Sequence, residues 1–384
     1  MKRRFRKRLI SLAMIPVLLG SMGWTAAALS PEKISAPSAL LMEAETGRVL
    51  FEKNAHEKRP CASITKVMTL LLVMEALDEG KIKLEDEVAA SAHAASMGGS
   101  DIWLKEGEVM SVDDLLKATV IMSANDAAVV LAEYIAGSES DFVAQMNQKA
   151  AELGMKDTTF KNCNGLDEDG HLTSAYDVAL MSRALISHEK IFDYTQVWMD
   201  SVRGGETQLV NTNKLLKTYN GITGLKTGTT GKAGSCITAT ATRDGLSLIS
   251  VVLGCSNTKD RFDSAAKLLD YGFANWESAQ LEIPALQQLA VTNGMESLVG
   301  VEAKSEGKVS VLVPKGKEEQ VKVSVSMPES VRAPVEKGQK LGEVLYQLED
   351  DTLGKVSITA TEAVEAIDWQ KCFVKLLESL LCFI

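Results

Sequence analysis

The sequence lacks the residue patterns that mark several common classes of hydrolase. Its 4 histidines include no His-Glu-x-x-His pair, so a zinc hydrolase has little support. The absence of Gly-x-Ser-x-Gly argues against an α/β-hydrolase esterase. The 6 cysteines match neither a disulfide framework nor a zinc site in their spacing, although Cys236 and Cys255 are expected on neighbouring strands where they could pair. We therefore expect neither a metal nor a cofactor.

The first 28 residues have the layout of a secretory signal peptide. A basic start (Lys2 to Arg8) precedes an apolar stretch from Leu9 to Trp24, and Ala26-Ala27-Ala28 follows. The alternative is an uncleaved membrane anchor, but Pro16 and Gly20 interrupt the apolar stretch. We predict cleavage after Ala28 and export of the remaining chain.

Positive charge is scarce once this leader is set aside. The whole chain has a formal net charge of −10, and the leader carries six basic and no acidic residues, so its removal gives −16. Proteins that bind DNA or RNA need a basic surface. The composition therefore excludes nucleic acid as the expected partner.

The body of the chain predicts an α+β fold for residues 29–278. Hairpins are expected at Ser38–Phe51 and Gly234–Leu253, near the two ends of this region. Between them lie helical patterns, among them Ile64–Leu77, which is apolar nearly all round, and Asp126–Ala136. Such an order predicts an antiparallel sheet that distant parts of the chain complete, with helices packed on its faces.

Two further segments follow this region. Residues 279–360 contain period-two runs such as Val309–Val313 and Val321–Val325, punctuated by turn residues, and they predict a small β domain. Residues 361–384 predict an amphipathic helix, because Ile367, Phe373 and Leu377 fall on one side and charged residues on the other.

A serine and a lysine begin the apolar helix. Ser63-Ile64-Thr65-Lys66 places both side chains on one helical face, one turn apart. A serine hydroxyl needs a base to take its proton before it acts as a nucleophile, and a buried lysine can be that base. Ser-x-x-K spacing alone is weak evidence, because it occurs six times in this chain.

Two other motifs distinguish Ser63 from the remaining serines. Ser123-Ala124-Asn125 and Lys226-Thr227-Gly228 each occur once. With Ser63 and Lys66 they follow the order of an established motif set of penicillin-binding proteins and class A β-lactamases, in which the middle motif is Ser-Asp-Asn. Taken separately, Ser123-Ala124-Asn125 could be no more than a helix cap, and Lys226-Thr227-Gly228 could be no more than a turn that leads into a strand. The ordered set on an exported chain favours catalysis.

Together these motifs resemble those of the D-alanyl-D-alanine carboxypeptidases among the low-molecular-mass penicillin-binding proteins. The resemblance covers nearly everything after the leader, and it includes Ala62–Lys66, Ser123–Asp126, Gly165-Leu166, Thr173–Asp177, Gly224–Thr229, Leu268–Phe273 and Ala333–Gly338. It implies the β-lactamase-like fold of the penicillin-binding transpeptidases. The expected substrate is a peptidoglycan stem peptide that ends in D-alanyl-D-alanine, and β-lactam antibiotics are the expected inhibitors.

The same resemblance implies a role for each motif residue. Ser63 would be the nucleophile and Lys66 its base, and Ser123 with Lys226 would protonate the leaving D-alanine. Asn125 would hold the substrate backbone. The oxyanion hole would consist of the backbone N–H groups of Ser63 and Thr229. Lys226, Thr227, Gly228 and Thr229 would face the substrate's terminal carboxylate. For Arg261, carboxylate binding and a surface position on a helix have equal support.

The resemblance also implies where the protein works. The helix at 361–384 resembles a membrane anchor that lies in the bilayer interface, which would attach the exported protein to the outer face of the cytoplasmic membrane. This segment has a net charge of −2, so its apolar face must provide the binding.

Three rival functions remain open from the sequence. A class A β-lactamase needs a glutamate to activate the deacylating water, and Asp157–Lys161 at the expected position contains none. A transpeptidase or endopeptidase with the same core would differ only in cleft shape. A non-catalytic penicillin or peptidoglycan sensor would have no need of Lys66 and Lys226 together with Ser63.

Overall fold

A five-stranded antiparallel sheet is the centre of the catalytic region. The computed structural model describes residues 29–305 and 307–374, so the predicted leader lies outside the described residues. The strands follow the order β2-β1-β9-β8-β7, with bounds β1 (Ser38–Glu43), β2 (Val49–Lys53), β7 (Ile222–Thr230), β8 (Gly234–Arg243) and β9 (Leu246–Cys255). The sheet therefore joins the first strands of the region to the last, as the sequence predicts.

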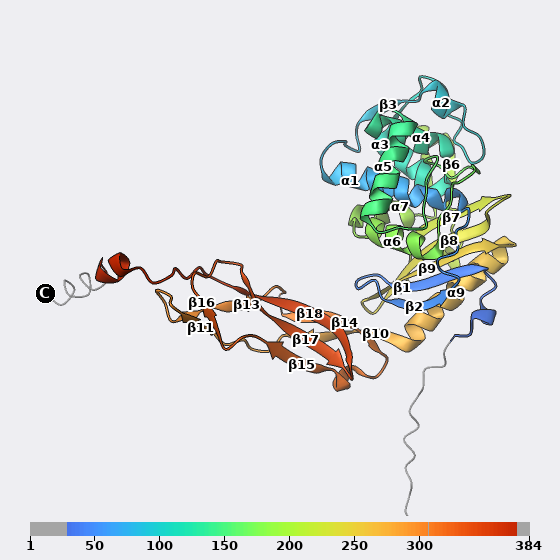
Figure 1. The fold of residues 1–384 in the computed structure, drawn as a ribbon. Helices are drawn as coiled ribbons and strands as arrows, with labels where there is room; N and C mark the ends of the chain where they lie inside the picture. Colours follow the sequence, from blue (N-terminus) through green and yellow to red (C-terminus); the bar gives the residue numbers. More distant parts are fainter. Residues whose placement is uncertain (1–28, 306, 375–384) are drawn as a thin grey trace, which may run out of the picture.

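Helices cover both faces of this sheet. The long helix α9 (Thr258–Asn275) packs on one face, and α6 (Ala175–Ile186) packs on the other with α1 (Lys66–Asp78) behind it (Figure 1). Alternate residues of β1 serve the two faces: Leu40 and Met42 join the core on the side of α1, whereas Ala39 and Leu41 join the core beneath α9. This period-two burial fixes the register of the strand.

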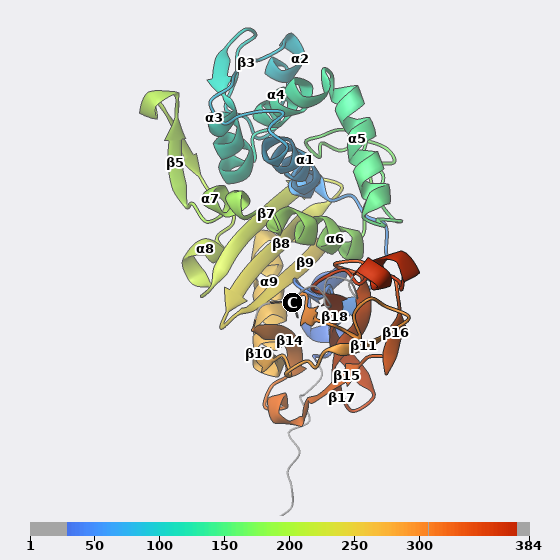
Figure 2. The ribbon, with the colours of Figure 1, turned by 90° about the vertical axis from the view of Figure 1, so that its left-hand side faces the viewer.

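Most of the remaining helices form a cap above the sheet, whereas α8 lies beside β7 and contributes Leu215 to the core beneath α9 (Figure 2). Among the described residues, four serines and an asparagine cap the N-termini of helices, because their side chains accept a hydrogen bond from a backbone N–H group. For example, the Ser174 Oγ accepts from the Asp177 N–H at 3.2 Å. The elements are η2 (Ala62–Thr65), α2 (Ala92–Ala95), α3 (Val112–Lys117), the π-helical turn η3 (Ala118–Met122), α4 (Asn125–Ala136), α5 (Glu139–Glu152), α7 (Phe192–Thr195) and α8 (Leu215–Thr218).

Two small antiparallel strand pairs extend the cap, and the chain between the first two strands includes α2. One pairs β3 (Glu87–Ala89) with β4 (Val109–Ser111), and the other pairs β5 (Met199–Val202) with β6 (Thr207–Val210). Arg203 at the tip of the second hairpin donates from Nε to Glu108 at 2.6 Å. This contact joins the β5–β6 hairpin to the segment that precedes β4.

A narrow β domain extends away from the catalytic region (Figure 1). It begins with β10 (Trp276–Glu282), which pairs with β14 (Lys308–Pro314). Its four-stranded sheet has the order β13-β18-β17-β15, and a three-stranded sheet has the order β12-β11-β16. The bounds are β11 (Leu289–Thr292), β12 (Leu298–Val299), β13 (Val301–Ala303), β15 (Lys322–Ser326), β16 (Ser330–Arg332), β17 (Lys340–Leu348) and β18 (Asp351–Ala360). Two small apolar clusters fill this domain.

The helix predicted over 361–384 begins later than predicted. Val364 is buried and forms a β-bridge with Val335, and Ala366 forms another with Gly294. Helical structure starts only at residue 369, and residues 375–384 lie outside the described residues. The amphipathic pattern did not reveal this later start, because an apolar residue such as Val364 can pack in a sheet as well as on a helix.

The described cysteines form no disulfide. Cys236 and Cys255, which the sequence placed on neighbouring strands, are both free and buried, as are Cys61 and Cys163. Cys236 faces a backbone N–H instead, accepting from Gly254 at 3.4 Å. These thiols therefore act as small core residues.

The described residues contain neither a membrane-spanning helix nor a cluster of metal-binding side chains. None of the helices in 29–305 and 307–374 is both long enough and apolar enough to cross a bilayer. In the same ranges, histidine, cysteine and acidic side chains form no group of three or more that could hold a metal ion.

Candidate active site

Ser63 and Lys66 lie where the sequence places them, at the start of the buried helix. Ser63 belongs to the short helix η2, and Lys66 is the first residue of α1. The lysine Nζ lies 3.1 Å from the Ser63 Oγ. Ala62, directly before the serine, has a φ of 51°. An alanine in this left-handed region is strained, a feature that often accompanies functional sites.

Lys66 is fully buried, and its ammonium group has three partners. Besides Ser63, Nζ donates to the Asn125 Oδ1 at 2.5 Å and to the Asn164 carbonyl at 2.7 Å. Burial lowers the pKa of Lys66 to about 7, although Asp101 and Asp126 oppose this shift. A lysine with a pKa near neutrality can take a proton from a hydroxyl and return it.

The second motif approaches Lys66 from the other side of the cleft. Ser123 ends the π-helical turn with a φ of 67°, and Asn125 is the first residue of α4. The Asn125 Nδ2 donates to the Gly98 carbonyl at 2.6 Å, which fixes its Oδ1 toward Lys66. The buried Ser123 Oγ has no hydrogen-bond partner within the described parts of the chain. This hydroxyl is available to a substrate.

The third motif lies on β7, the edge strand of the sheet beside the helical cap. Lys226 is 1% exposed, and burial lowers its pKa well below the usual range, with further lowering by Lys66 and Arg261. Its Nζ donates to the Thr227 carbonyl at 3.2 Å. The Thr227 hydroxyl donates to Thr212 at 2.7 Å and so lies away from Lys226.

Gly228 allows β7 to pass directly beside Ser63. A β-carbon at this position would lie 2.8 Å from both the Ser63 nitrogen and the Cys61 carbonyl oxygen. Only a glycine fits such a close approach of two backbones. The next residue, Thr229, is exposed. Its backbone N–H and that of Ser63 therefore belong to adjoining segments.

Arg261 reaches this end of β7 from the first turn of α9. The side chain is 5% exposed, and its Nη1 donates to the Gly228 carbonyl at 3.2 Å and to the Thr229 Oγ1 at 3.1 Å. Of the two interpretations that the sequence left open, the surface position is excluded by this burial. The guanidinium Nε has no hydrogen-bond partner among the described residues.

Three functional contacts were not found by sequence reasoning. Asn164 gives its carbonyl to Lys66, and Gly165 packs so tightly that a β-carbon would lie 2.0 Å from the Ala62 carbonyl oxygen. The buried His171 lies 2.7 Å from the Thr65 Oγ1 through its Nε2. Gly165 was visible as part of a motif, but backbone contacts such as that of Asn164 leave no signal in residue types.

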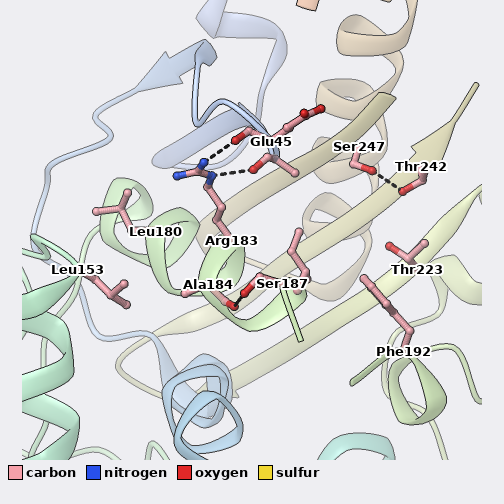
Figure 3. A pocket seen from close by; sticks show the side chains of 12 residues that line it. Glu45, Leu153, Leu180, Arg183, Ala184, Ser187, Phe192, Thr223, Thr242 and Ser247 are labelled. Atoms are coloured by element: carbon pink, nitrogen blue, oxygen red, sulfur yellow. Dashed lines mark hydrogen bonds between the residues drawn. The ribbon is translucent and has the colours of Figure 1, made fainter. Parts of the chain in front are cut away.

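A separate cavity of about 650 Å³ lies away from these side chains (Figure 3). It is lined by residues of α6, Phe192 of α7 and the ends of the sheet strands. Arg183 within it donates to the carbonyls of Ala44 and Glu45 at 2.6 and 2.5 Å. The cavity borders β7 at Thr223, near the opposite end of the strand from Thr229. It is therefore distinct from the catalytic cleft.

Comparison with known proteins identifies two family models in the chain. The model described as D-alanyl-D-alanine carboxypeptidase matches residues 25–257, and the model described as Penicillin-binding protein 5, C-terminal domain matches residues 285–366. D-alanyl-D-alanine carboxypeptidase DacF of Bacillus subtilis is 42% identical over 368 residues, which are 93% of this chain and 94% of that protein.

Solved structures agree with these matches. Penicillin binding protein 5 of Haemophilus influenzae superposes with a TM-score of 0.78 at 30% identity, covering 88% of this chain and 100% of that one. Penicillin-Binding Protein D2 of Listeria monocytogenes, in its ampicillin-bound form, has a TM-score of 0.58 at 36% identity and covers 62% of this chain and 98% of its own.

Proposed function

This chain belongs to the D-alanyl-D-alanine carboxypeptidase family of serine-type peptidases, and we propose that it removes the terminal D-alanine of peptidoglycan stem peptides through an acyl-enzyme on Ser63. One observation carries the choice of nucleophile. The Ser63 Oγ lies 3.1 Å from the Nζ of a buried lysine whose pKa is lowered to about 7. That pairing supports proton transfer at neutral pH.

Acylation begins when neutral Lys66 takes the Ser63 proton. The Oγ then attacks the carbonyl carbon between the two D-alanines, and negative charge develops on the carbonyl oxygen. The backbone N–H groups of Ser63 and Thr229 stabilise this oxyanion, and each such donor contributes about 3 kcal/mol in measured hydrolases. The close passage of β7 past Ser63, which Gly228 permits, supports this pair of donors.

Loss of D-alanine needs a proton on the departing nitrogen. The otherwise unpartnered Ser123 hydroxyl donates its proton to this nitrogen and receives in exchange the proton that Lys66 took from Ser63, with Lys226 helping to position Ser123, so that Lys66 is neutral again. Water then attacks the acyl carbon, with Lys66 again accepting a proton, and the Ser63 hydroxyl is restored. Asn125 orients Lys66 and holds the backbone of the substrate.

The terminal carboxylate of the substrate binds at the Thr229 end of β7. Arg261 provides a cation there and Thr229 a hydroxyl, and Lys226 and Thr227 lie next to them on β7, in a chain whose formal net charge is −10. A cation in an acidic protein attracts an anionic group to one place. Arg261 is the residue that gives this end of the cleft a permanent charge.

Penicillin mimics the D-alanyl-D-alanine end, so benzylpenicillin should form a stable adduct on Ser63. Intact-mass analysis should show one added penicilloyl group on the full chain and none on Ser63→Ala. The function itself is tested by D-alanine release from a pentapeptide that ends in D-alanyl-D-alanine. Release by the wild type and not by Ser63→Ala is expected. Penicillin acylation without any release would instead indicate a transpeptidase, an endopeptidase or a sensor.

We also propose a separate role for each segment of the chain. The leader of residues 1–28 directs export, residues 29–278 carry the chemistry, and residues 279–360 hold the catalytic domain away from the membrane. The segment 361–384 attaches the protein to the outer face of the cytoplasmic membrane. Exposed Ile367, Trp369 and Phe373 support this attachment.

A further inference from the structure

Trp103 is held outward in a strained conformation close to the catalytic motif. Its side chain is 73% exposed, whereas its neighbours Ile102 and Leu104 are 1% and 4% exposed. Its φ is 56°, in the left-handed region that bulky residues rarely adopt. An exposed, strained aromatic residue is costly for folding alone, so its position suggests a role outside the protein.

Hydrogen bonds to Asp126 hold the two residues that flank Trp103. The buried Asp126 carboxylate accepts the N–H of Ile102 at 3.1 Å and that of Leu104 at 3.0 Å. Arg203 donates to the Ile102 carbonyl at 2.9 Å. Asp126 directly follows Asn125, whose own N–H donates to the Ser100 carbonyl at 2.6 Å. The turn that carries Trp103 is therefore fixed to the Asn125 side of the cleft.

The ring of Trp103 has no stacking partner in the described residues. The rings of two other tryptophans do have partners: Trp198 lies under the Lys217 Nζ, 4.2 Å from the ring centroid, and Trp276 makes an edge-to-face contact with Tyr271, with 5.2 Å between the ring centroids. A rigid indole with a free face is suited to the C–H-rich surface of a ligand.

The contacts of the site indicate which part of a substrate reaches this ring. Arg261 and Thr229 lie at the end of β7 that is proposed to receive the terminal carboxylate, whereas the turn of Trp103 is joined to Asn125, which contacts Lys66 from α4. We propose that Trp103 is a stacking surface for the substrate upstream of the scissile bond, in contact with a sugar ring or with the aliphatic side chain of a stem residue. This inference rests on the proposed function and extends it to substrate recognition.

The experiment compares three substrates on the full-length enzyme. They are N-acetyl-D-alanyl-D-alanine, the free stem pentapeptide and the disaccharide pentapeptide. Trp103→Ala should reduce kcat/KM by roughly 3- to 10-fold for the substrate that reaches the ring, through KM, and leave the acetylated dipeptide unchanged. A reduced kcat/KM for both the pentapeptide and the disaccharide pentapeptide would show that the ring contacts a stem side chain. A reduced kcat/KM for the disaccharide pentapeptide alone would show that the ring contacts a sugar. Trp103→Phe should restore most of the loss.

Two control variants distinguish the loss of the Trp103 ring from an effect on folding. Trp103→Gly removes the ring and accepts a positive φ, so it should match Trp103→Ala in kinetics without a lower thermal midpoint. Leu298→Ala removes an exposed apolar side chain in the β domain and should change none of the three rates.

Equal losses on all three substrates, or no loss on any, would overturn the stacking role. If the wild type releases no D-alanine at all, the proposed function fails instead, and binding decides the inference separately. Calorimetry of the disaccharide pentapeptide with Ser63→Ala, alone and combined with Trp103→Ala, should show weaker binding to the double variant. The same affinity for both proteins would also overturn the proposal.

Discussion

A β-carbon on Gly228 would lie 2.8 Å from the backbone nitrogen of Ser63. Gly165 approaches the same nitrogen from the loop after α5, where a β-carbon would lie 2.9 Å from it. Two glycines therefore enclose the amide that the mechanism assigns to the oxyanion hole. The position of the nucleophile depends on the absence of side chains at two places far apart in the chain.

The Gly165 contact predicts a large catalytic effect for a single methyl group. Gly165→Ala would force the added carbon against the Ala62 carbonyl, 2.0 Å away, and shift the nucleophile. A displacement of about 1 Å at a reacting group can reduce the rate on the order of 100-fold. We expect a loss of that size in penicillin acylation, measured by stopped flow.

Gly170→Ala is the matched control, because Gly170 lies in the same loop. Its φ of 82° is close to the 88° of Gly165, so both variants carry similar backbone strain. The nearest atom to its β-carbon is the flexible Lys161 Cε at 3.5 Å. Gly170→Ala should therefore lose about 1 kcal/mol of stability and retain its acylation rate. Equal kinetic losses in the two variants would refute a specific contact at Ser63.

The pKa of Lys66 predicts how acylation depends on pH. Because burial lowers this pKa to about 7, the neutral base is abundant above neutrality and falls about tenfold for each pH unit below it. The second-order rate constant for penicillin acylation should rise from pH 5.5 to about pH 7 and then level off. Lys66→Arg, which stays protonated, should lose roughly 100-fold or more at every pH. A flat profile for the wild type would argue against Lys66 as the base.

Much of this site follows from the sequence because its residue types are chemically demanding. Hydrogen bonds join Ser63, Lys66 and Asn125, and the ordered motifs that contain these residues and Lys226 led to the resemblance from which their roles are expected. Backbone partners are different: the Asn164 carbonyl that holds Lys66 could come from any residue. Long-range contacts of this kind depend on the path of the chain, which residue types do not encode locally.

In the fold, too, some elements were predicted from the sequence and others were not. Turn residues between apolar runs predicted the first hairpin and the β8–β9 hairpin, and helical patterns, continuously apolar in α1, predicted α1 and α4. Local pattern and tertiary burial agree in these elements. The segment 361–368 misled the prediction because its apolar residues fit a helical face. Pairing of Val364 with Val335 prevailed, since a strand contact distant in sequence buries Val364 completely.

His171 predicts a loss of stability in acid. Its Nδ1 accepts the Lys161 N–H at 3.1 Å, so Nε2 carries the proton and donates to Thr65, whose hydroxyl donates to the Ala62 carbonyl. Burial lowers the pKa of His171 from 6.5 to about 4. A group with a folded pKa below its unfolded one binds protons more tightly when unfolded. Its contribution is complete above about pH 6.5 and is lost as the pH falls toward 4, by up to about 3 kcal/mol.

Comparison with His171→Gln isolates this effect from other titrating groups. A glutamine can accept one hydrogen bond and donate another without gaining a proton. The thermal midpoint of the wild type should fall more than that of the variant between pH 7.5 and pH 5. Parallel shifts in the two proteins would show that His171 does not titrate on unfolding.

The late start of the terminal helix predicts which truncation releases the protein from membranes. A cut before residue 369 keeps the buried Val364 and the hydrogen bond from the Ile367 N–H to the Asn293 carbonyl, so the β domain should stay folded. A cut before Thr361 would remove Val364 from its core and confuse instability with detachment. We expect the chain without residues 369–384 to remain in the supernatant when vesicles are sedimented, whereas the full chain sediments with them.

Charge determines how this binding should respond to salt. The segment 361–384 has a net charge of −2, so attraction to anionic lipid contributes little and the apolar face must provide the affinity. Binding to phosphatidylcholine vesicles should therefore be similar at 0.1 and 1 M salt, since screening affects only charge interactions. Trp369→Glu with Phe373→Glu, two exposed residues one turn apart, should detach the full-length chain. Continued sedimentation of both the double variant and the truncated chain would place the anchor elsewhere.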